Sequence, residues 1–272
     1  MPDDIVVADP RFLLAAEAPA VRVVTYNVHK CVGVDRRYDP ERIATVLREI
    51  DPDIACLQEV AVRRRNAQHL DQCAFLGEAT GCHVVPSAAI REHRGRCGNA
   101  ILTRFPVLAA RSIDLSVGAY ARRGAIDADL LIGDRVLRVI ATHFGLLAGE
   151  RQLQVNRLIA ALAEPLPPER RAADAVLLMG DLNEWRGSSD GIRALDRRLG
   201  PSAAARTFPS WLPVLPLDRI YATYPAVLRA SHVYRSPLAR LASDHLPLVG
   251  TLHWSVARAV SQRGDWLDSA AA

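Results

Sequence analysis

Lysine is nearly absent from this 272-residue chain. Lys30 is the only lysine among 34 basic residues, so arginine supplies the rest of the positive charge, and the formal net charge is +4 with an isoelectric point of about 9.0. A GC-rich coding sequence would produce this bias, and the match between arginine forks and phosphate oxygens would also favour it. The charge alone therefore indicates a polyanionic partner only weakly.

Long apolar runs and paired cysteines are lacking as well. No run approaches the ~20 apolar residues that a membrane helix requires, so we expect no transmembrane segment. The five cysteines include no CxxC pair, and a disulfide framework or a zinc site is poorly supported. The first residues are acidic rather than basic, unlike a secretory signal. We therefore expect a cytoplasmic protein with reduced thiols.

No repeat and no low-complexity linker divides the chain. Hydrophobic residues make up 50% of it, which is enough to bury a sizeable core. We predict one folded domain over residues 21–254. A loosely ordered segment over residues 1–20 would precede this domain, and a C-terminal tail over residues 255–272 would follow it.

Short apolar runs rich in β-branched residues recur between three helical patterns, which span residues 40–50, 69–80 and 150–164. Several strand pairs are joined by short turns, and Gly133-Asp134 marks the tip of one hairpin. A strictly alternating βαβ chain would not contain such turns. We therefore predict mixed sheets packed face to face with helices outside. The proline-dense residues 207–218 predict a long surface loop that leads into a strand.

Polar residues stand at the ends of many of the predicted strands. They are Asn27, Glu59, Asn99, His143, Asp181, Asn183, Asp244 and His245. Singly, each has an ordinary explanation, since a lone Asn after a strand is usually a turn residue and a lone His is usually structural. Together they favour a shared polar site at one edge of the scaffold.

This ordered series resembles the endonuclease/exonuclease/phosphatase superfamily. The matching blocks are TYNVH, LQEV, GNAILTR, ARRGA, THF, GDLNEW, LDRIYA and SDHLP, and they follow the family's order. The combination of LQE, GDLN and SDH is specific, whereas each block alone is weak. The resemblance implies an α+β fold, a four-layer αββα sandwich of two packed mixed β-sheets flanked by helices. It makes residues 21–254 the catalytic domain, with the site at one end of the sheets.

The resemblance also implies a metal-dependent phosphoric ester hydrolase that attacks a P–O bond with an activated water. The implied metal ligands are Asn27, Glu59 and Asp244, whose oxygen atoms suit Mg²⁺, with Mn²⁺ as a substitute. The implied catalytic residues are Asp181, Asn183, His143, His245 and Asp218, the last of which would fix the tautomer of His245.

Phosphate oxygens would be bound by Asn99 and by an arginine of the ARRGA block. Arg122 and Arg123 are adjacent there, and alternate strand residues face opposite ways. Only one of the two is therefore expected to reach the phosphate, and the sequence does not select it.

The substrate is less well determined. Two basic loops would suit a nuclease acting on DNA or RNA, although a solvated charged surface explains them equally well. They contain Arg63, Arg64, Arg65 and His69, and Arg91, His93, Arg94 and Arg96. An apolar loop with Trp211, Leu212, Val214 and Leu215 favours a sphingomyelin-type phospholipid diesterase instead, although packing of this loop on its own protein is the simpler expectation. The intact polar series argues against an inactive binding module. We rank a nuclease-like phosphodiesterase first and a phospholipid diesterase or phosphatase second, and expect a monomer.

Overall fold

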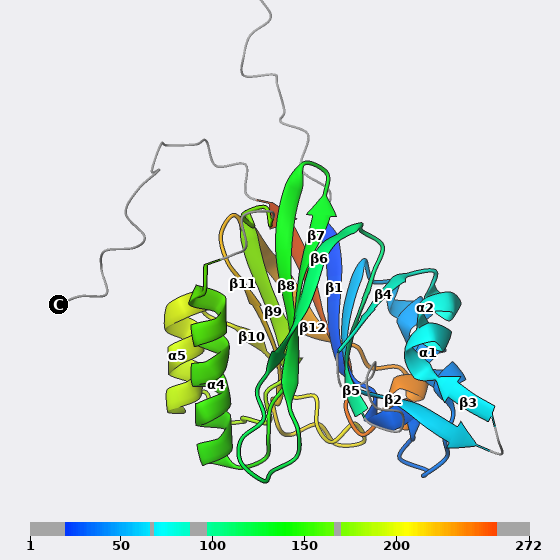
Figure 1. The fold of residues 1–272 in the computed structure, drawn as a ribbon. Coiled ribbons are helices and arrows are strands. Elements are labelled where there is room, and N and C mark those ends of the chain that lie inside the picture. The colour runs from blue at the N-terminus through cyan, green and yellow to red at the C-terminus, as the bar shows by residue number, and fades with distance from the viewer. Residues whose placement is uncertain (1–19, 66–67, 88–96, 166–169, 255–272) are drawn as a thin grey trace, which may run out of the picture.

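Two β-sheets lie face to face between two layers of helices (Figure 1). The computed structural model describes residues 20–65, 68–87, 97–165 and 170–254. The predicted α+β fold, a four-layer αββα sandwich of mixed sheets, is confirmed. The N-terminal segment over residues 1–19 and the tail over residues 255–272 lie outside the described residues.

The first sheet has the strand order β12-β13-β1-β2-β5-β4, and β3 pairs with β2. Its parallel pair is β1 with β2. The strands are β1 (Val21–Asn27), β2 (Ile54–Arg65), β3 (Gln68–Asp71), β4 (His83–Pro86), β5 (Cys97–Thr103), β12 (Ala226–Val233) and β13 (Leu248–Trp254).

The second sheet has the strand order β10-β11-β9-β8-β7-β6, with β8 and β9 parallel. The strands are β6 (Val107–Asp114), β7 (Gly124–Ile132), β8 (Arg135–His143), β9 (Ala175–Asp181), β10 (Ala203–Ala204) and β11 (Asp218–Ala222). The predicted hairpin joins β7 to β8, and Gly133 at its tip has a φ of 63°, a conformation that glycine adopts without steric cost.

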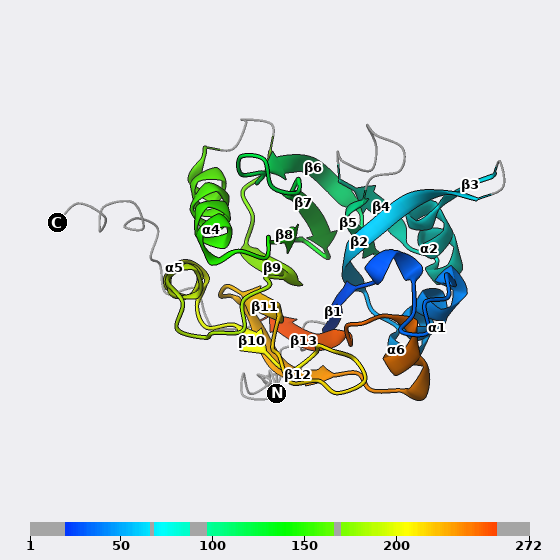
Figure 2. The ribbon, with the colours of Figure 1, turned by 90° about the horizontal axis from the view of Figure 1, so that it is seen from below.

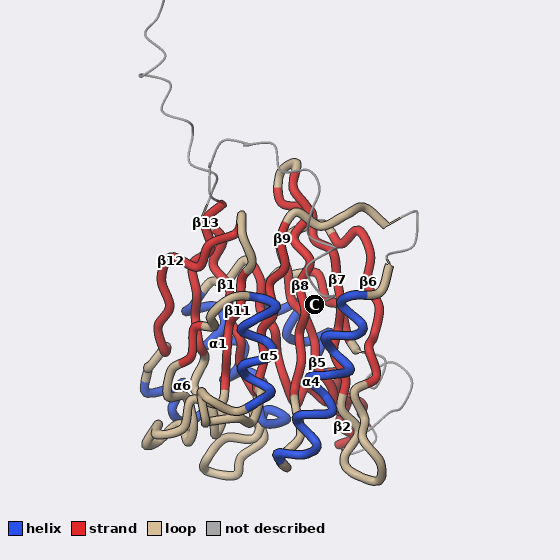
Figure 3. The backbone as a smooth tube through the Cα atoms, turned by 90° about the vertical axis from the view of Figure 1, so that its left-hand side faces the viewer, coloured by secondary structure: helices blue, strands red, loops and turns tan. Residues whose placement is uncertain are grey.

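The alternation of side chains along the strands produces three hydrophobic cores. Val23, Ile54, Val139 and Met179 belong to the core between the two sheets. A second core lies between the first sheet and helices α1 (Pro40–Ile50), α2 (Gln72–Thr80) and α6 (Pro237–Ala242). A third core lies under α4 (Ala148–Ala163) and α5 (Asp190–Leu199), which run side by side across the second sheet (Figure 3).

The helix expected over residues 69–80 is shorter than predicted. Residues 69–71 pair with β2, and the Asp71 carboxylate accepts the backbone N–H groups of Cys73 and Ala74 at 2.9 and 3.2 Å. This N-cap starts the helix at Gln72. None of the helices in the described ranges is both long and apolar enough to cross a membrane.

Strand registers place the ends that carry polar residues at one end of the sandwich. Asp181 on β9 is paired with His143 on β8 and with Asp218 on β11. In the first sheet, β1 runs to Asn27 beside the start of β13. Figure 2 views the molecule from this end. The loops that follow these strands therefore surround the same region.

Candidate active site

Asp181 lies at the centre of the candidate site. Its Oδ2 atom is 3.5 Å from Nε2 of His143 and 3.5 Å from Nε2 of His245. The same oxygen accepts a 3.1 Å hydrogen bond from Nδ2 of Asn27. The backbone N–H of Asn183 donates to Oδ1 of Asp181 at 2.9 Å. The two sheets thus meet at one carboxylate, which two imidazoles and two asparagines surround.

The turn after β9 aims the Asn183 side chain back toward His143. Asn183 has a φ of 49°, a left-handed conformation that asparagine tolerates better than most residues. Its Nδ2 lies 3.1 Å from Nε2 of His143 and donates to the Phe144 carbonyl at 2.9 Å. This amide therefore fixes the orientation of the His143 ring.

The His245 ring is hydrogen-bonded at Nδ1, the nitrogen that faces away from Asp181, by a buried carboxylate. Its Nδ1 lies 2.9 Å from Oδ2 of Asp218, and the Thr207 hydroxyl donates to that oxygen at 2.5 Å. The Phe208 ring packs at a tilt against the imidazole, with 4.9 Å between centroids. A carboxylate at Nδ1 leaves Nε2 to face Asp181 and the site.

The two imidazoles have opposite electrostatic environments. Burial lowers the pKa of His143 to about 4; Asp181 opposes this shift and Arg123 adds to it. Burial also disfavours the charged form of His245, but the carboxylates of Asp218 and Asp181 outweigh it and raise its pKa to about 10. At neutral pH a neutral imidazole and an imidazolium therefore share one carboxylate.

Glu59 reaches the site through a distortion of β2. The pairing of β2 with β5 shifts register between Leu57 and Val60, and Glu59 within this bulge has a φ of 56°. Bulges re-aim single side chains. The Glu59 carboxylate lies 3.4 Å from Nδ2 of Asn27, which links it to the Asp181 cluster.

The chemistry of Glu59 and Asn27 fits a hard divalent cation. Among the described residues, no three His, Cys, Asp or Glu side chains cluster closely enough to enclose a metal ion. Mg²⁺ does not need such a cage, because it takes one or two carboxylates and keeps several waters. The Oδ1 atom of Asn27 accepts the N–H of His29 at 3.0 Å, while its Nδ2 faces Glu59 and Asp181. As a metal ligand, Asn27 would use the second lone pair of Oδ1 or a turned amide.

Asp244, the third implied metal ligand, lies nearer the rim. Its carboxylate is 3.4 Å from the Ser243 hydroxyl and 3.9 Å from Nδ1 of His29. Ser243 itself is buried; its hydroxyl donates to the Asn27 carbonyl at 2.7 Å and accepts the N–H of His245 at 3.3 Å. Ser243 thereby joins the end of β1 to the loop that carries His245.

The two adjacent arginines have different surroundings. Arg123 is half-buried and lies close enough to His143 to lower the pKa of that ring, and its Nε atom is buried without a hydrogen-bond partner in the described part of the chain. Arg122 is exposed and lies near Asp114; hydrogen bonds from Ser116 mainly lower the pKa of that carboxyl, and the charge of Arg122 adds to this shift. Of the two, Arg123 is the one beside the cluster around Asp181.

Asn99 bridges the two sheets rather than projecting freely into the site. Its Nδ2 donates to the Gly124 carbonyl at 2.8 Å and lies 3.4 Å from the Ala141 carbonyl. Its amide hydrogens are thus directed at backbone oxygens. Its implied contact with phosphate remains a prediction.

The loops named for substrate choice are described only in part. Residues 91–96 lie outside the described residues, as do the side chains of residues 63–65 and 69. Thr207 and Ser210 at the base of the proline-dense loop are buried, as expected for a loop that packs on its own protein. That expectation is wrong for the tip, because Trp211 and Leu212 are 66% and 55% exposed.

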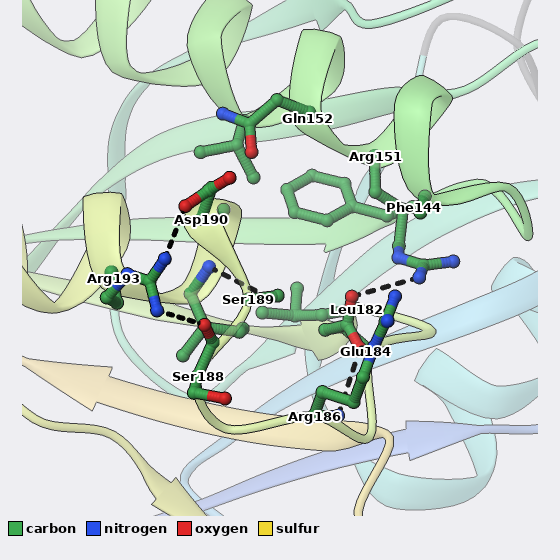
Figure 4. Close-up of a pocket in the computed structure, with 14 residues that line it drawn as sticks. Phe144, Arg151, Gln152, Leu182, Glu184, Arg186, Ser188, Ser189, Asp190 and Arg193 are labelled. Atoms are coloured by element: carbon green, nitrogen blue, oxygen red, sulfur yellow. Dashed lines mark hydrogen bonds and ion pairs between the residues drawn. The ribbon is translucent and has the colours of Figure 1, made fainter.

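A cavity of about 330 Å³ lies behind the turn after β9, between the first turns of α4 and α5 (Figure 4). Leu182 contributes to its apolar floor. Its charged side chains pair with one another: Arg151 lies 2.9 Å from Glu184, and Arg193 contacts Asp190. The lining therefore has few uncompensated charges to select an anion, and it does not include Asp181, His143 or His245.

Sequence reasoning missed three residues that contact the site residues: Thr207, Phe208 and Ser243. None of them ends an apolar run, so the pattern that revealed the polar series could not reveal them. Ser243 alone carried a signal, since it belongs to the SDHLP block.

Proteins with the same fold are known. Residues 24–245 match the model of the Endonuclease/Exonuclease/phosphatase family. The uncharacterized protein YbhP of Escherichia coli (strain K12) is 29% identical over 251 residues, which cover 85% of this chain and 96% of that protein. The endonuclease/exonuclease/phosphatase of Beutenbergia cavernae DSM 12333 is 24% identical, with a TM-score of 0.65 over 87% of this chain and 72% of that one. The mannosyl-6-phosphatase Bt3783 of Bacteroides thetaiotaomicron VPI-5482 is 18% identical, with a TM-score of 0.66 over 85% of this chain and 99% of that one. This chain belongs to the Endonuclease/Exonuclease/phosphatase family, whose members are phosphoric ester hydrolases.

Proposed function

We propose that this protein is a divalent-metal-dependent phosphodiesterase that hydrolyses a P–O bond with an activated water. The observation that carries the proposal is the placement of the Asp181 carboxylate 3.5 Å from both His143 and His245. A carboxylate that orients water, beside imidazoles that bind the phosphoryl group, is what this hydrolysis requires.

Each residue has a distinct part in the proposed reaction. Asp181, together with Asn183, orients the attacking water and accepts one of its protons as the new O–P bond forms. His245, charged at neutral pH, donates from Nε2 to a phosphoryl oxygen, and Asp218 stabilises this imidazolium. Negative charge that develops on the phosphoryl oxygens is met by His245 and Arg123. The leaving oxygen departs with the electrons of the broken P–O bond and takes up the proton that the His245 imidazolium gives from Nε2.

Glu59 would hold the metal ion, with Asn27 and Asp244 as its neighbours. When bound there, a divalent cation supplies Lewis-acid stabilisation of charge on the phosphoryl oxygens. Family members generally use divalent metals; we propose Mg²⁺, with Mn²⁺ as a substitute, because the donors are oxygen atoms.

Nucleic acid remains our first candidate substrate. Three exposed aromatic side chains lie on loops at the catalytic end, namely Tyr120 (52%), Trp185 (54%) and Trp211 (66%). Exposed rings around a phosphodiesterase site offer stacking surfaces for the bases of a single strand. The Arg186 guanidinium lies 5.6 Å from the Trp185 ring centroid, so a cation accompanies one of these rings.

A phospholipid is the second candidate, and one observation favours it. The same rim carries exposed aliphatic side chains that base stacking does not need: Leu146 (72%), Leu147 (52%), Leu212 (55%) and Val214 (48%). Apolar side chains gathered around a site suit contact with the boundary between headgroups and acyl chains.

A substrate panel tests the proposal. It would comprise single-stranded DNA, duplex DNA, RNA, sphingomyelin vesicles, inositol phosphates and, given one similar structure, mannose 6-phosphate, each with Mg²⁺ and with Mn²⁺. Nucleic-acid cleavage that falls steeply with salt supports the first candidate. Turnover of vesicles alone, reduced by Trp211→Ala, would reverse the ranking. No hydrolysis of any phosphoester would refute the proposal.

A further inference from the structure

Shortly after β1, three consecutive residues that are not glycine have the left-handed backbone conformation. His29, Lys30 and Cys31 have φ values of 45°, 55° and 57°. L-residues avoid this region, and a run of three is far rarer than a single residue. Such a conformation persists only where its surroundings enforce it, and it is commonly found at functional sites.

One buried side chain ties this turn to the bulge that carries Glu59. Gln72, the first residue of α2, is fully buried. Its Nε2 donates to the Lys30 carbonyl at 2.9 Å, and its Oε1 accepts the N–H of Ala61 at 2.8 Å. Ala61 lies two residues beyond Glu59, so Gln72 fixes the spacing between the turn and the bulge.

As a result, the only lysine of the chain lies beside the proposed metal ligand. The Nζ atom of Lys30 is 3.7 Å from Oε2 of Glu59, and the Lys30 side chain is 45% exposed. An ammonium is a compact point charge that can share a small space with a phosphate oxygen, whereas a guanidinium is a broad planar fork. Every other Lys or Arg position of the chain is arginine, and the compact ammonium of lysine is found only at this strained position.

We propose that Lys30 binds a non-bridging oxygen of the substrate phosphate, and that Gln72 positions it to do so. The inference rests on the proposed function, because it needs a phosphate at Asp181. Arg123 lies close enough to His143 to act on its charge, and Lys30 contacts Glu59. A phosphate within reach of both side chains would receive charge-assisted hydrogen bonds from each of them.

A purely local role for Lys30 makes a different prediction. If the ammonium served only to neutralise Glu59 and hold its carboxylate in place, its removal would disturb metal binding first. If it contacts phosphate, its removal weakens phosphate binding while Glu59 keeps its affinity for a cation. Loss of a neighbouring positive charge would leave the metal affinity unchanged or raise it.

The test measures binding of inorganic phosphate and of Mn²⁺ to the full-length protein by isothermal titration calorimetry. We expect Lys30→Met to weaken phosphate binding in saturating Mn²⁺ by about tenfold or more, the scale of a charge-assisted hydrogen bond, with Mn²⁺ affinity equal or higher. Lys30→Arg should retain part of the phosphate affinity. Arg48→Met is the matched control, because Arg48 is 44% exposed and also pairs with a glutamate, Glu41; it should bind phosphate like the wild type.

Gln72→Met tests the positioning role, with circular dichroism to confirm that the variant is folded. We expect it to weaken phosphate binding although Lys30 is still present. Unchanged phosphate affinity in Lys30→Met, or a loss of Mn²⁺ affinity that accounts for the phosphate effect, overturns the proposal. If hydrolysis fails on every substrate while Lys30→Met still weakens phosphate binding, the proposed function falls and the Lys30 contact stands.

Discussion

The Nδ1 atom of His245 lies 2.9 Å from the Oδ2 atom of Asp218, and both side chains are buried. Arg219, the sequence neighbour of Asp218, directs its guanidinium to the Ser202 hydroxyl and the Glu184 carbonyl instead. The Asp218 carboxylate is therefore available to orient His245 and to stabilise its charged form.

We predict that His245→Ala lowers kcat by about 10²–10⁴-fold, the scale of a positioned acid–base group. Asp218→Asn should cause much of the same loss, because it removes the group that orients and charges His245. The double variant should lose little more than His245→Ala alone, since the two residues act as a unit. Single-turnover rates of the three variants measure this coupling. Fully multiplicative losses would argue against the pair.

The adjacent arginines provide a matched comparison. Arg123 has a buried Nε without a partner among the described residues and lies near His143, whereas Arg122 is exposed near Asp114. We predict that Arg123→Ala lowers kcat/KM by about 10–100-fold through loss of a charged contact to phosphate. Arg122→Ala should change kcat/KM by no more than about twofold, as expected of an exposed charge. The reverse order of effects would assign the phosphate contact to Arg122.

The strand ends were predictable because the amino-acid sequence itself shows where an apolar run stops at a polar residue. Asn27, His143 and Asp181 were found in this way, and the structure brings them together. The choice between Arg122 and Arg123 was not predictable, since their orientation depends on how the loop before β7 enters the sheet. Gln72 could not be found either, because the two groups that it links, the Lys30 carbonyl and the Ala61 N–H, are backbone groups that any sequence could supply.

A buried ionic cluster on the second sheet gives a prediction about stability and pH. Burial alone would raise the pKa of Asp127, but hydrogen bonds from Arg138, Arg170 and Arg111 outweigh it and hold this pKa well below its usual value. The folded state therefore keeps the carboxylate charged at a pH where the unfolded chain binds a proton. The stability that this gives is complete above the unfolded pKa of about 3.9 and is lost as pH falls below it.

We predict that Asp127→Asn lowers the free energy of unfolding by about 3–5 kcal/mol at pH 7, the cost of breaking a buried ion pair. The difference from the wild type should shrink as pH falls from about 4 toward the folded pKa. Urea unfolding of both proteins across pH 3–7 (about the range that brackets the unfolded pKa) measures it. A difference that is independent of pH would mean that the charge of Asp127 contributes nothing.

Dependence on a divalent cation at Glu59 is the central claim. The most direct test measures phosphoester hydrolysis by wild-type protein and by Glu59→Gln, first in EDTA and then across titrations with Mg²⁺ and Mn²⁺. We predict no hydrolysis in EDTA and full recovery of the wild type with either ion. Glu59→Gln should remain folded but show strongly reduced hydrolysis and require more metal, with Mn²⁺ more effective than Mg²⁺ because it binds such sites more tightly. Full hydrolysis by the wild type in EDTA, with no metal added, would contradict the claim.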